Sequence, residues 1–361
     1  MDKVRVGILG SGFIAELHAA ALQLVQDAEV IAVASPTPGK ARRFAEQRGI
    51  PRFFEDHQDL LALEEVDMIT IGYPNFLHEK VTVDAARAGK HVVCEKPLCC
   101  SLEEADRMIE ACRQGGVLLM YGEELCFAPK YVRVKQLIEE GALGSVFRVK
   151  QSEEHSGPHA AWFWDVEKSG GGVLMDMGCH SIEYARWLFG KPEVKSVWAS
   201  LGTYVHANKT KGDDHSICVV EYQGGKVGIA EDSWAKPGGV DDRAEVYGSE
   251  GFTHADLLRG NSLLTYSQSG YGYAVEKAGE TKGYSFTAFE ELWNYGFPQE
   301  LAHFVRCVQG KEQPLETGED GREVLRIISA AYESAGSGQR VDWPYDPQGL
   351  KKPIDLWKKR R

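Results

Sequence analysis

The chain has 361 residues, of which 43% are hydrophobic and 26% are charged, and its formal net charge is −12. This length exceeds what one compact core usually holds, so we expect two domains. The acidic balance would repel a phosphate backbone, which argues against a nucleic-acid partner. No segment has the roughly 18–20 consecutive apolar residues of a bilayer span, so we expect no membrane contact either.

From residue 3 to about 122, short apolar segments alternate with segments of helical periodicity. Strands are expected at 4–9, 30–35, 68–72, 91–94 and 117–122, with helices at 13–26, 38–49, 78–89 and 101–116 between them. Near-continuous apolar strands separated by amphipathic helices predict a parallel sheet covered on both faces. We therefore expect an α/β Rossmann-type domain with a doubly wound parallel sheet over residues 1–123.

After residue 123 the pattern changes to short strand-like segments joined by tight turns. Gly224-Gly225 separates two alternating segments, which is typical of a β-hairpin. Helices are expected at about 129–140, 298–309 and 319–336. This pattern predicts an α+β domain with a mainly antiparallel open sheet over residues 124–361.

A glycine-rich loop, Gly10-x-Gly12-x-x-Ala15, joins the first expected strand to the first expected helix. The first glycine permits a tight turn, the second lets the backbone approach a pyrophosphate, and the small third residue allows close contact between helix and sheet. The N-terminus of the helix then offers free N–H groups to the phosphates. In this position the motif predicts a dinucleotide-binding site.

The end of the second strand bears on the choice between NAD and NADP. An NAD site usually has a carboxylate there for the ribose 2′-hydroxyl, whereas this chain has Ser35. Lys40, Arg42 and Arg43 follow and could bind a 2′-phosphate, but they could equally form the solvated face of a helix. The sequence leaves both NAD and NADP open.

Two further motifs occur in order along the chain. Glu95-Lys96-Pro97 follows a strand of the first domain, and GGGVLMDMGCH occupies residues 170–180. In combination with the glycine-rich loop, these motifs resemble the Gfo/Idh/MocA oxidoreductase family, and the resemblance covers essentially the whole chain. It implies that Lys96, Asp176 and His180 form the catalytic site.

The chemistry of these three residues agrees with the resemblance. Asp176 and His180 are four residues apart and would share one face of a helix, where the carboxylate can orient the imidazole as a general base. Lys96 would place a cation near the carbinol oxygen, where negative charge develops. Pro97 would hold Lys96 through its fixed φ, with a cis Lys96–Pro97 bond as one option.

The resemblance also implies that Tyr73, Asn75 and His78 line the cofactor pocket, at the carboxyl end of a parallel strand, where such sheets bind ligands. His78 could equally cap the helix that it begins. The residues that we expect to contact the cofactor are Gly10, Gly12, Phe13, Ile14, Ser35, Thr37, Tyr73, Asn75, His78, Glu95 and Lys96.

Where many relatives have a GYNxRF pattern, this chain has Gly122-Glu123-Glu124-Leu125-Cys126-Phe127. The loss of the arginine argues against a substrate with a phosphate or carboxylate, which a guanidinium would bind in bidentate fashion. Glu123 and Glu124 suit a neutral, hydroxyl-rich ligand instead, unless they pair with a basic residue elsewhere.

Aromatic side chains gather in two segments of the second domain. The segment 153–172 contains His155, Trp162 and Trp164, and aromatic faces that stack on sugar C–H surfaces predict the wall of a carbohydrate pocket. The alternative is that the tryptophans pack beneath the second sheet. The second segment, 271–297, could be a lid or a subunit interface, and we favour the interface. The expected substrate-binding residues are Glu123, Glu124, His155, Trp162, Trp164, Asp176 and His180.

Together these features predict an NAD(P)-dependent dehydrogenase that acts on a CH–OH group of a sugar, glycoside or cyclic polyol, with a keto-glycoside as one product. We expect no metal, a homo-oligomer (dimer or tetramer) formed through the second-domain sheet, and a cytoplasmic location with reduced cysteines. One alternative is an NAD-dependent glycosidase that works by transient oxidation and elimination. The other is a noncatalytic sugar or dinucleotide sensor, against which the intact Lys96, Asp176 and His180 argue.

Overall fold

The computed structural model describes residues 3–258, 263–270, 281–287, 290–347, 349 and 352–358. The chain divides into two compact units. The first comprises Met1–Glu124 and Gly296–Glu323, and the second comprises Leu125–Tyr295 and Val324–Arg361. This division differs from the expected domains, 1–123 and 124–361, chiefly because a late segment of the chain belongs to the first unit.

The first unit contains a six-stranded parallel sheet in the order β3-β2-β1-β4-β5-β6. The strand order reverses between β1 and β4, so this is the predicted Rossmann-type arrangement. The strands are β1 (Val4–Leu9), β2 (Ala28–Ala34), β3 (Arg52–Phe54), β4 (Met68–Ile71), β5 (His91–Glu95) and β6 (Leu119–Gly122). The helices that follow them are α1 (Phe13–Leu22), α2 (Lys40–Arg48), α3 (His57–Leu61), α4 (His78–Arg87) and α5 (Leu102–Gly115).

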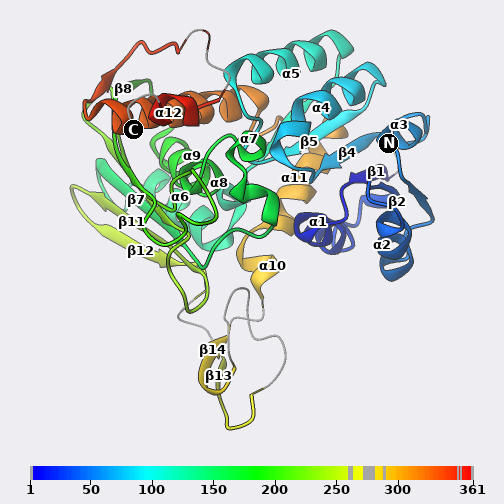
Figure 1. Cartoon of the computed structure of the whole chain (residues 1–361), viewed down its shortest axis with the longest axis horizontal. Coiled ribbons are helices and arrows are strands. Elements are labelled where there is room, and N and C mark those ends of the chain that lie inside the picture. Colours follow the sequence, from blue (N-terminus) through cyan, green and yellow to red (C-terminus); the bar gives the residue numbers. More distant parts are fainter. Residues whose placement is uncertain are drawn as a thin grey trace. The chain divides into compact units, whose positions relative to one another are not determined.

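Helix α11 (Phe297–Val308) completes the first unit by packing on α1, and Figure 1 shows the two helices side by side. The apolar residues of α11 that are buried include Phe297, Leu301, Phe304 and Val305. The segment after α11 also joins the edge of the sheet, where the backbone N–H of Tyr121 donates to the Glu316 carbonyl at 3.2 Å. By its contacts this segment belongs to the first unit, where its apolar face is buried.

The second unit contains a seven-stranded sheet in the order β12-β11-β7-β10-β9-β8-β15. Among the described strands of this sheet, only β7 and β10 pair in parallel, so the sheet is mainly antiparallel, as predicted. Its strands are β7 (Val146–Glu154), β8 (Val194–Gly202), β9 (His215–Tyr222), β10 (Val227–Ser233), β11 (Asp241–Gly248), β12 (Phe252–Asp256) and β15 (Val341–Asp342). Gly224 and Gly225 both have positive φ and join β9 to β10 in the predicted hairpin. A separate ribbon pairs β13 (Leu263–Ser267) with β14 (Gly283–Thr287).

One helix of the second unit is buried along its whole length. Helix α9 (Gly178–Phe189) packs against β7 and β10, and all of its residues are buried. The other helices are α6 (Pro129–Glu139), α7 (Val166–Ser169), α8 (Val173–Asp176), α10 (Glu291–Asn294), α12 (Gly318–Ser337), which begins in the first unit, and α13 (Ile354–Lys358). Among the helices that the structure describes, none combines the length and the apolar character that a membrane crossing requires.

All eight cysteines lie in the described part of the chain, and each is a buried free thiol. Burial raises the pKa of several of these thiols, including that of Cys307 to about 11. This agrees with the expectation of reduced cysteines.

Candidate active site

The loop between β1 and α1 has the geometry that a dinucleotide diphosphate requires. Gly10 has a φ of +132°, and a Cβ atom there would lie 2.9 Å from the carbonyl oxygen of Gly72, so the position requires glycine. A Cβ at Gly12 would meet no described atom within 4 Å, which leaves the backbone at the start of α1 open to a ligand. No described side chain caps α1, and its first N–H groups can therefore bind phosphate. Beside this loop, Phe13 is exposed and Ile14 packs over Gly72.

The end of β2 is occupied by a small polar pair. Ser35 is buried, and its hydroxyl accepts a hydrogen bond from that of Ser11 at 2.8 Å. Thr37 is exposed in the turn that follows. A carboxylate does reach this turn from β3, because Glu55 Oε1 accepts a hydrogen bond from the backbone N–H of Gly39 at 3.2 Å. The sequence pattern did not predict β3, since three residues are too few to show a periodicity.

Lys40, Arg42 and Arg43 are all exposed at the start of α2. The guanidinium of Arg42 lies over the ring of Phe53, 5.2 Å from its centroid. Both interpretations of these basic residues therefore stand, and NAD and NADP remain the two candidate cofactors.

The loop after β4 is tied to the turn after β5 by His78. Its Nε2 lies 2.8 Å from the carbonyl oxygen of Tyr73, and its Nδ1 lies 3.1 Å from that of Pro97 and 3.2 Å from that of Leu98. The side chain has no exposed surface, and this burial lowers the pKa of His78. The suggestion that His78 caps its helix is wrong, because its nitrogens face carbonyls of two other loops.

Tyr73 and Asn75 are both buried in the loop after β4. The hydroxyl of Tyr73 donates to the carbonyl of Ala34 at 3.3 Å, which links this loop to the end of β2. Burial raises the pKa of Tyr73, with a smaller contribution from the charge of Asp56. The phenol therefore stays protonated and acts as a donor.

Lys96 follows β5 directly and is half-buried. Its backbone N–H donates to Glu95 Oε2 at 3.2 Å, and the Lys96–Pro97 peptide bond is cis. The other oxygen of Glu95, Oε1, lies 2.7 Å from Nε2 of His18 on α1. A carboxylate at the end of β5 thus connects the lysine turn to the helix that opens at the glycine-rich loop.

Glu123, Glu124 and Glu300 are among the further glutamates that are buried in the first unit. Glu123 and Glu124 follow β6, and Glu300 lies in the first turn of α11. Neither carboxyl oxygen of Glu300 has a hydrogen-bond partner of ordinary geometry among the described residues. Burial, and then the charges of Glu95, Glu124 and Glu123, raise the pKa of Glu300 well above its usual value.

The predicted helix that would carry both Asp176 and His180 is wrong. Asp176 is the last residue of α8 and His180 lies in the first turn of α9, with Met177 between the two helices. The Asp176 carboxylate accepts a hydrogen bond from the indole Nε1 of Trp234 at 3.2 Å. Both Asp176 and His180 are buried in the second unit.

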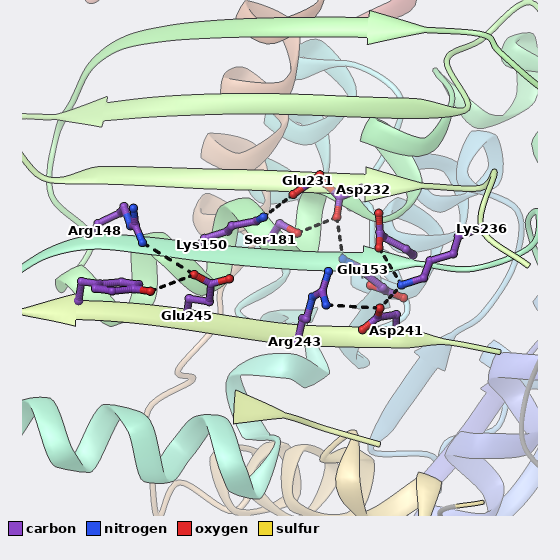
Figure 2. Close-up of polar contacts among 12 residues, drawn as sticks. Arg148, Lys150, Glu153, Ser181, Glu231, Asp232, Lys236, Asp241, Arg243 and Glu245 are labelled. Carbon is purple, nitrogen blue, oxygen red and sulfur yellow. Dashed lines mark hydrogen bonds and ion pairs between the residues drawn. The ribbon is translucent and has the colours of Figure 1, made fainter. Parts of the chain in front are cut away.

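A carboxylate that the sequence did not predict lies beside the imidazole of His180. Nε2 of His180 is 3.8 Å from Oε2 of Glu153 on β7. Asp232 links the strand of Glu153 to the helix of His180, as Figure 2 shows for Glu153 and Ser181. Its Oδ1 accepts one hydrogen bond from the backbone N–H of Glu153 at 3.3 Å and another from the hydroxyl of Ser181 at 2.7 Å. Burial raises the pKa of Asp232 well above its usual value.

The aromatic segment before α7 divides into packed and partly exposed residues. His155 is buried, with its ring centroid 5.3 Å from that of His159. The ring centroids of Trp164 and Trp234 lie 5.3 Å apart, and Nζ of Lys209 lies 5.1 Å from the ring centroid of Trp164. These contacts pack Trp164 against other side chains of the second unit. Trp162 is half-buried and stacks on Phe163 at 3.8 Å.

Within the aromatic segment 271–297, Tyr271, Tyr273 and Phe289 lie outside the described residues. The side chains of Tyr284 and Trp293 are exposed.

Sequence reasoning missed four residues that contact the candidate site residues: His18, Glu153, Trp234 and Glu300. The available signal was a polar residue at a position of apolar periodicity. His18 lies in an otherwise alanine- and leucine-rich helix, and Glu300 lies among the buried apolar residues of α11.

Comparison with known proteins places these features in one family. Residues 4–123 match the family model described as "Oxidoreductase family, NAD-binding Rossmann fold", and residues 131–254 match "GFO/IDH/MocA C-terminal domain". The chain belongs to the Gfo/Idh/MocA oxidoreductases. It therefore has an NAD-binding Rossmann domain and belongs to a dehydrogenase family that acts on CH–OH groups with NAD(P).

Relatives within this family span nearly the whole chain. The scyllo-inositol 2-dehydrogenase (NAD(+)) of Bacillus subtilis (strain 168) is 30% identical over 94% of this chain and 96% of its own. The D-glucoside 3-dehydrogenase of Escherichia coli (strain K12) is 27% identical over 94% of this chain and 97% of its own. The crystal structure of GenD2 from gentamicin A biosynthesis, in complex with NAD, has a TM-score of 0.89 and 29% identity, covering 96% of this chain and 97% of that chain.

Proposed function

We propose that this Gfo/Idh/MocA oxidoreductase interconverts a secondary hydroxyl and a ketone on a sugar, glycoside or cyclic polyol, with a keto-glycoside as one product. The observation that carries the proposal is the turn at Lys96, which follows the end of β5 and is anchored by Glu95 through its backbone N–H. Such a cation at the carboxyl edge of a dinucleotide-binding sheet suits an oxygen that gains negative charge. Similarity to an inositol and a glucoside dehydrogenase supports the same substrate class.

We assign the chemistry to Lys96, Asp176 and His180. The bound nicotinamide supplies the redox step. Lys96 stabilises the substrate oxygen, and His180 takes up or returns the hydroxyl proton as general base and acid. Oε2 of Glu153 lies 3.8 Å from Nε2 of this imidazole and places a second acidic group beside it. Asp176, held by the indole of Trp234, is a polar contact for the substrate or for His180.

A neutral substrate follows from the charges in the first unit. Glu123 and Glu124 follow β6, in the segment where many relatives have an arginine at the position of Leu125 or Cys126, and both are buried among other carboxyl groups. An anionic substrate group would be repelled there, whereas hydroxyl groups can donate to carboxylates. Trp162, which is half-buried, is the remaining candidate for stacking on a sugar ring.

The cofactor is NAD or NADP, and the carboxylate of Glu55 at the turn after β2 supports NAD. A negative charge near the expected ribose position would repel a 2′-phosphate. The eight buried free thiols further support a reducing compartment such as the cytoplasm.

A homo-oligomer through the second-unit sheet is the assembly that we propose. One side of β7, β10 and β11 carries charged residues in pairs, which Figure 2 shows: Arg148 with Glu245, Lys150 with Glu231 and Arg243 with Asp241. Strand β8, which β9 separates from β10 in the same sheet, exposes Trp198. A surface with an exposed tryptophan and paired charges has the composition of a protein–protein interface.

The test is a screen of sugars, inositols and glycosides with both NAD and NADP, following the absorbance of the reduced nicotinamide and the mass of the product. On the best substrate, Lys96→Met and His180→Ala should each lower kcat/KM by about 10²–10⁴-fold. Lys80→Met and His254→Ala, which replace exposed residues, serve as controls. Near-normal turnover by both active-site variants would refute the assignment, and cleavage of a glycoside without net nicotinamide reduction would identify the glycosidase alternative.

A further inference from the structure

His18 is a buried polar residue on the helix that opens at the cofactor loop. It lies in α1, two turns from Gly12, and its side chain has no exposed surface. Its Nε2 is 2.7 Å from Oε1 of Glu95, and its ring is tilted against that of Phe297 with the centroids 6.2 Å apart. An imidazole in such an apolar position is retained only if its hydrogen bond offsets the cost of burial.

The surroundings of His18 indicate which nitrogen carries the proton. Nδ1 has no hydrogen-bond partner among the described residues. A proton on Nδ1 would leave a buried donor unsatisfied, so the geometry favours a proton on Nε2. This Nε2–H then donates to the Glu95 carboxylate.

Glu95 thereby accepts two N–H groups from two different elements. Oε1 accepts from His18 on α1, and Oε2 accepts from the backbone of Lys96 at 3.2 Å. An amide NH₂ in place of either oxygen would turn a donor toward one of these N–H groups. The chain of contacts runs from the helix behind the glycine-rich loop to the residue that carries the proposed catalytic ammonium.

We propose that His18 and Glu95 are positioning residues that fix the Lys96 turn relative to the cofactor helix. This inference rests on the proposed function of Lys96. His18 touches neither substrate nor cofactor in this role. Its loss should therefore lower kcat, because a displaced ammonium stabilises the transition state less well, while the affinity for the cofactor is retained.

A purely structural role for His18 makes a different prediction. A core histidine that only fills space could be replaced by a residue of similar volume with loss of stability alone. His18→Leu removes the donor and keeps the apolar packing, whereas His18→Gln can place an amide N–H near the position of Nε2. The Gln variant should thus restore activity if the hydrogen bond to Glu95 is what matters.

The experiment compares His18→Leu, His18→Gln, Glu95→Gln and Lys96→Met with the wild-type protein. Measurements are cofactor affinity by titration calorimetry, kcat and KM on the substrate found in the screen, and the thermal unfolding midpoint. We expect His18→Leu to bind the cofactor within about threefold of wild type while kcat falls by about 10–100-fold. His18→Gln should recover most of the wild-type kcat. Glu95→Gln should lower kcat at least as much as His18→Leu does, because the NH₂ group of the new glutamine would face one of the two N–H groups that Glu95 accepts.

The outcomes separate this inference from the proposed function. Wild-type kcat in His18→Leu and Glu95→Gln, with Lys96→Met inactive, would overturn the positioning role and leave the function intact. Normal turnover by Lys96→Met would overturn both. If His18→Leu does not fold, the comparison of His18→Gln with Glu95→Gln decides, since equal kcat losses in the two would contradict the proposed hydrogen bond.

Discussion

Glu300 lies in the first turn of α11 with its carboxyl group fully enclosed. Its surroundings are apolar residues of the same helix together with Glu95, Glu123 and Glu124, whose charges follow burial as causes of its raised pKa. The folded protein therefore holds a proton on Glu300 that the unfolded chain releases near pH 4.5, the ordinary pKa of the group. Stability from this residue is greatest at or below that pH and falls as the pH rises toward the raised pKa.

Glu300→Gln should make the protein more stable than wild type at pH 8, because the amide keeps the shape of the neutral acid and cannot ionise on unfolding. The difference in the free energy of unfolding between Glu300→Gln and wild type should be small near pH 4.5. It should grow by up to about 1.4 kcal/mol for each pH unit until the pH reaches the pKa of Glu300 in the folded protein. Urea unfolding midpoints at several pH values measure it, with the exposed Glu319→Gln as control. A stability difference that does not change with pH would contradict the buried proton.

Individual residues also show where sequence reasoning stops. The glycine positions, Lys96 and the strand ends follow from local pattern, and the structure places them in the expected elements. The positions of Trp234 and Glu153 do not follow, because Glu153 lies in β7 and Trp234 directly follows β10, and the sequence cannot align these strands with the GGGVLMDMGCH segment. Spacing suggests that Asp176 and His180 share a helix face, but the break at Met177 places them in two different helices.

At the scale of elements, the short helix α8 depends on one buried carboxylate. Asp213 accepts hydrogen bonds from the backbone N–H of Leu174 at 2.8 Å, from that of Gly172 at 3.2 Å and from the Tyr332 hydroxyl at 2.5 Å. A Cβ at Gly172 would lie 2.0 Å from the Asp213 carbonyl oxygen. Helix α8 ends at Asp176, so this anchor fixes the position of a candidate catalytic residue.

Asp213→Asn should destabilise the protein by about 1–3 kcal/mol, because its NH₂ group replaces one acceptor oxygen and leaves buried N–H or O–H donors unpaired. Activity should fall in the remaining folded protein as α8 loses its fixed position. Tyr332→Phe removes a single hydroxyl and should lower the free energy of unfolding by less than Asp213→Asn does. Chemical unfolding and kcat measure both effects, with the exposed Asp59→Asn as control; unchanged stability in Asp213→Asn would refute the anchor.

Most elements of the fold were predictable for a physical reason. Strands buried on both faces and amphipathic helices leave strong periodic patterns, as in β1, β4 and α5. The short strand β15 and the ribbon of β13 and β14 leave only weak periodic patterns. Strand β14 has five residues and β15 has two, so their pairing depends on neighbours that lie far away in sequence.

At the scale of the whole molecule, the first unit is assembled from two separate parts of the chain. Residues 1–124 supply the sheet, and the segment 296–323 supplies α11 and the backbone contact at Tyr121. No local pattern reveals this, because the amphipathic face of α11 predicts burial without saying against which element. The packing of α11 on α1 is what assigns α11 to the first unit.

A fragment of residues 1–124 should therefore fold poorly, since the contact surface of α1 for α11 would be exposed to water. We expect low soluble yield, loss of a cooperative thermal transition and no measurable NAD binding. Joining residues 296–323 to the fragment through a flexible linker should recover all three. Cooperative unfolding of the 1–124 fragment on its own would show that α11 is dispensable.

The enclosure of every native sulfhydryl has a practical consequence for spectroscopy. Maleimide and methanethiosulfonate labels react with accessible thiolates, and burial leaves the natural side chains poor targets. A single cysteine introduced on the surface, for example in place of exposed Asp59, would then take up a fluorophore or spin label selectively without removal of the existing eight. Paired labels of this kind would report changes in the protein as dinucleotide and sugar bind.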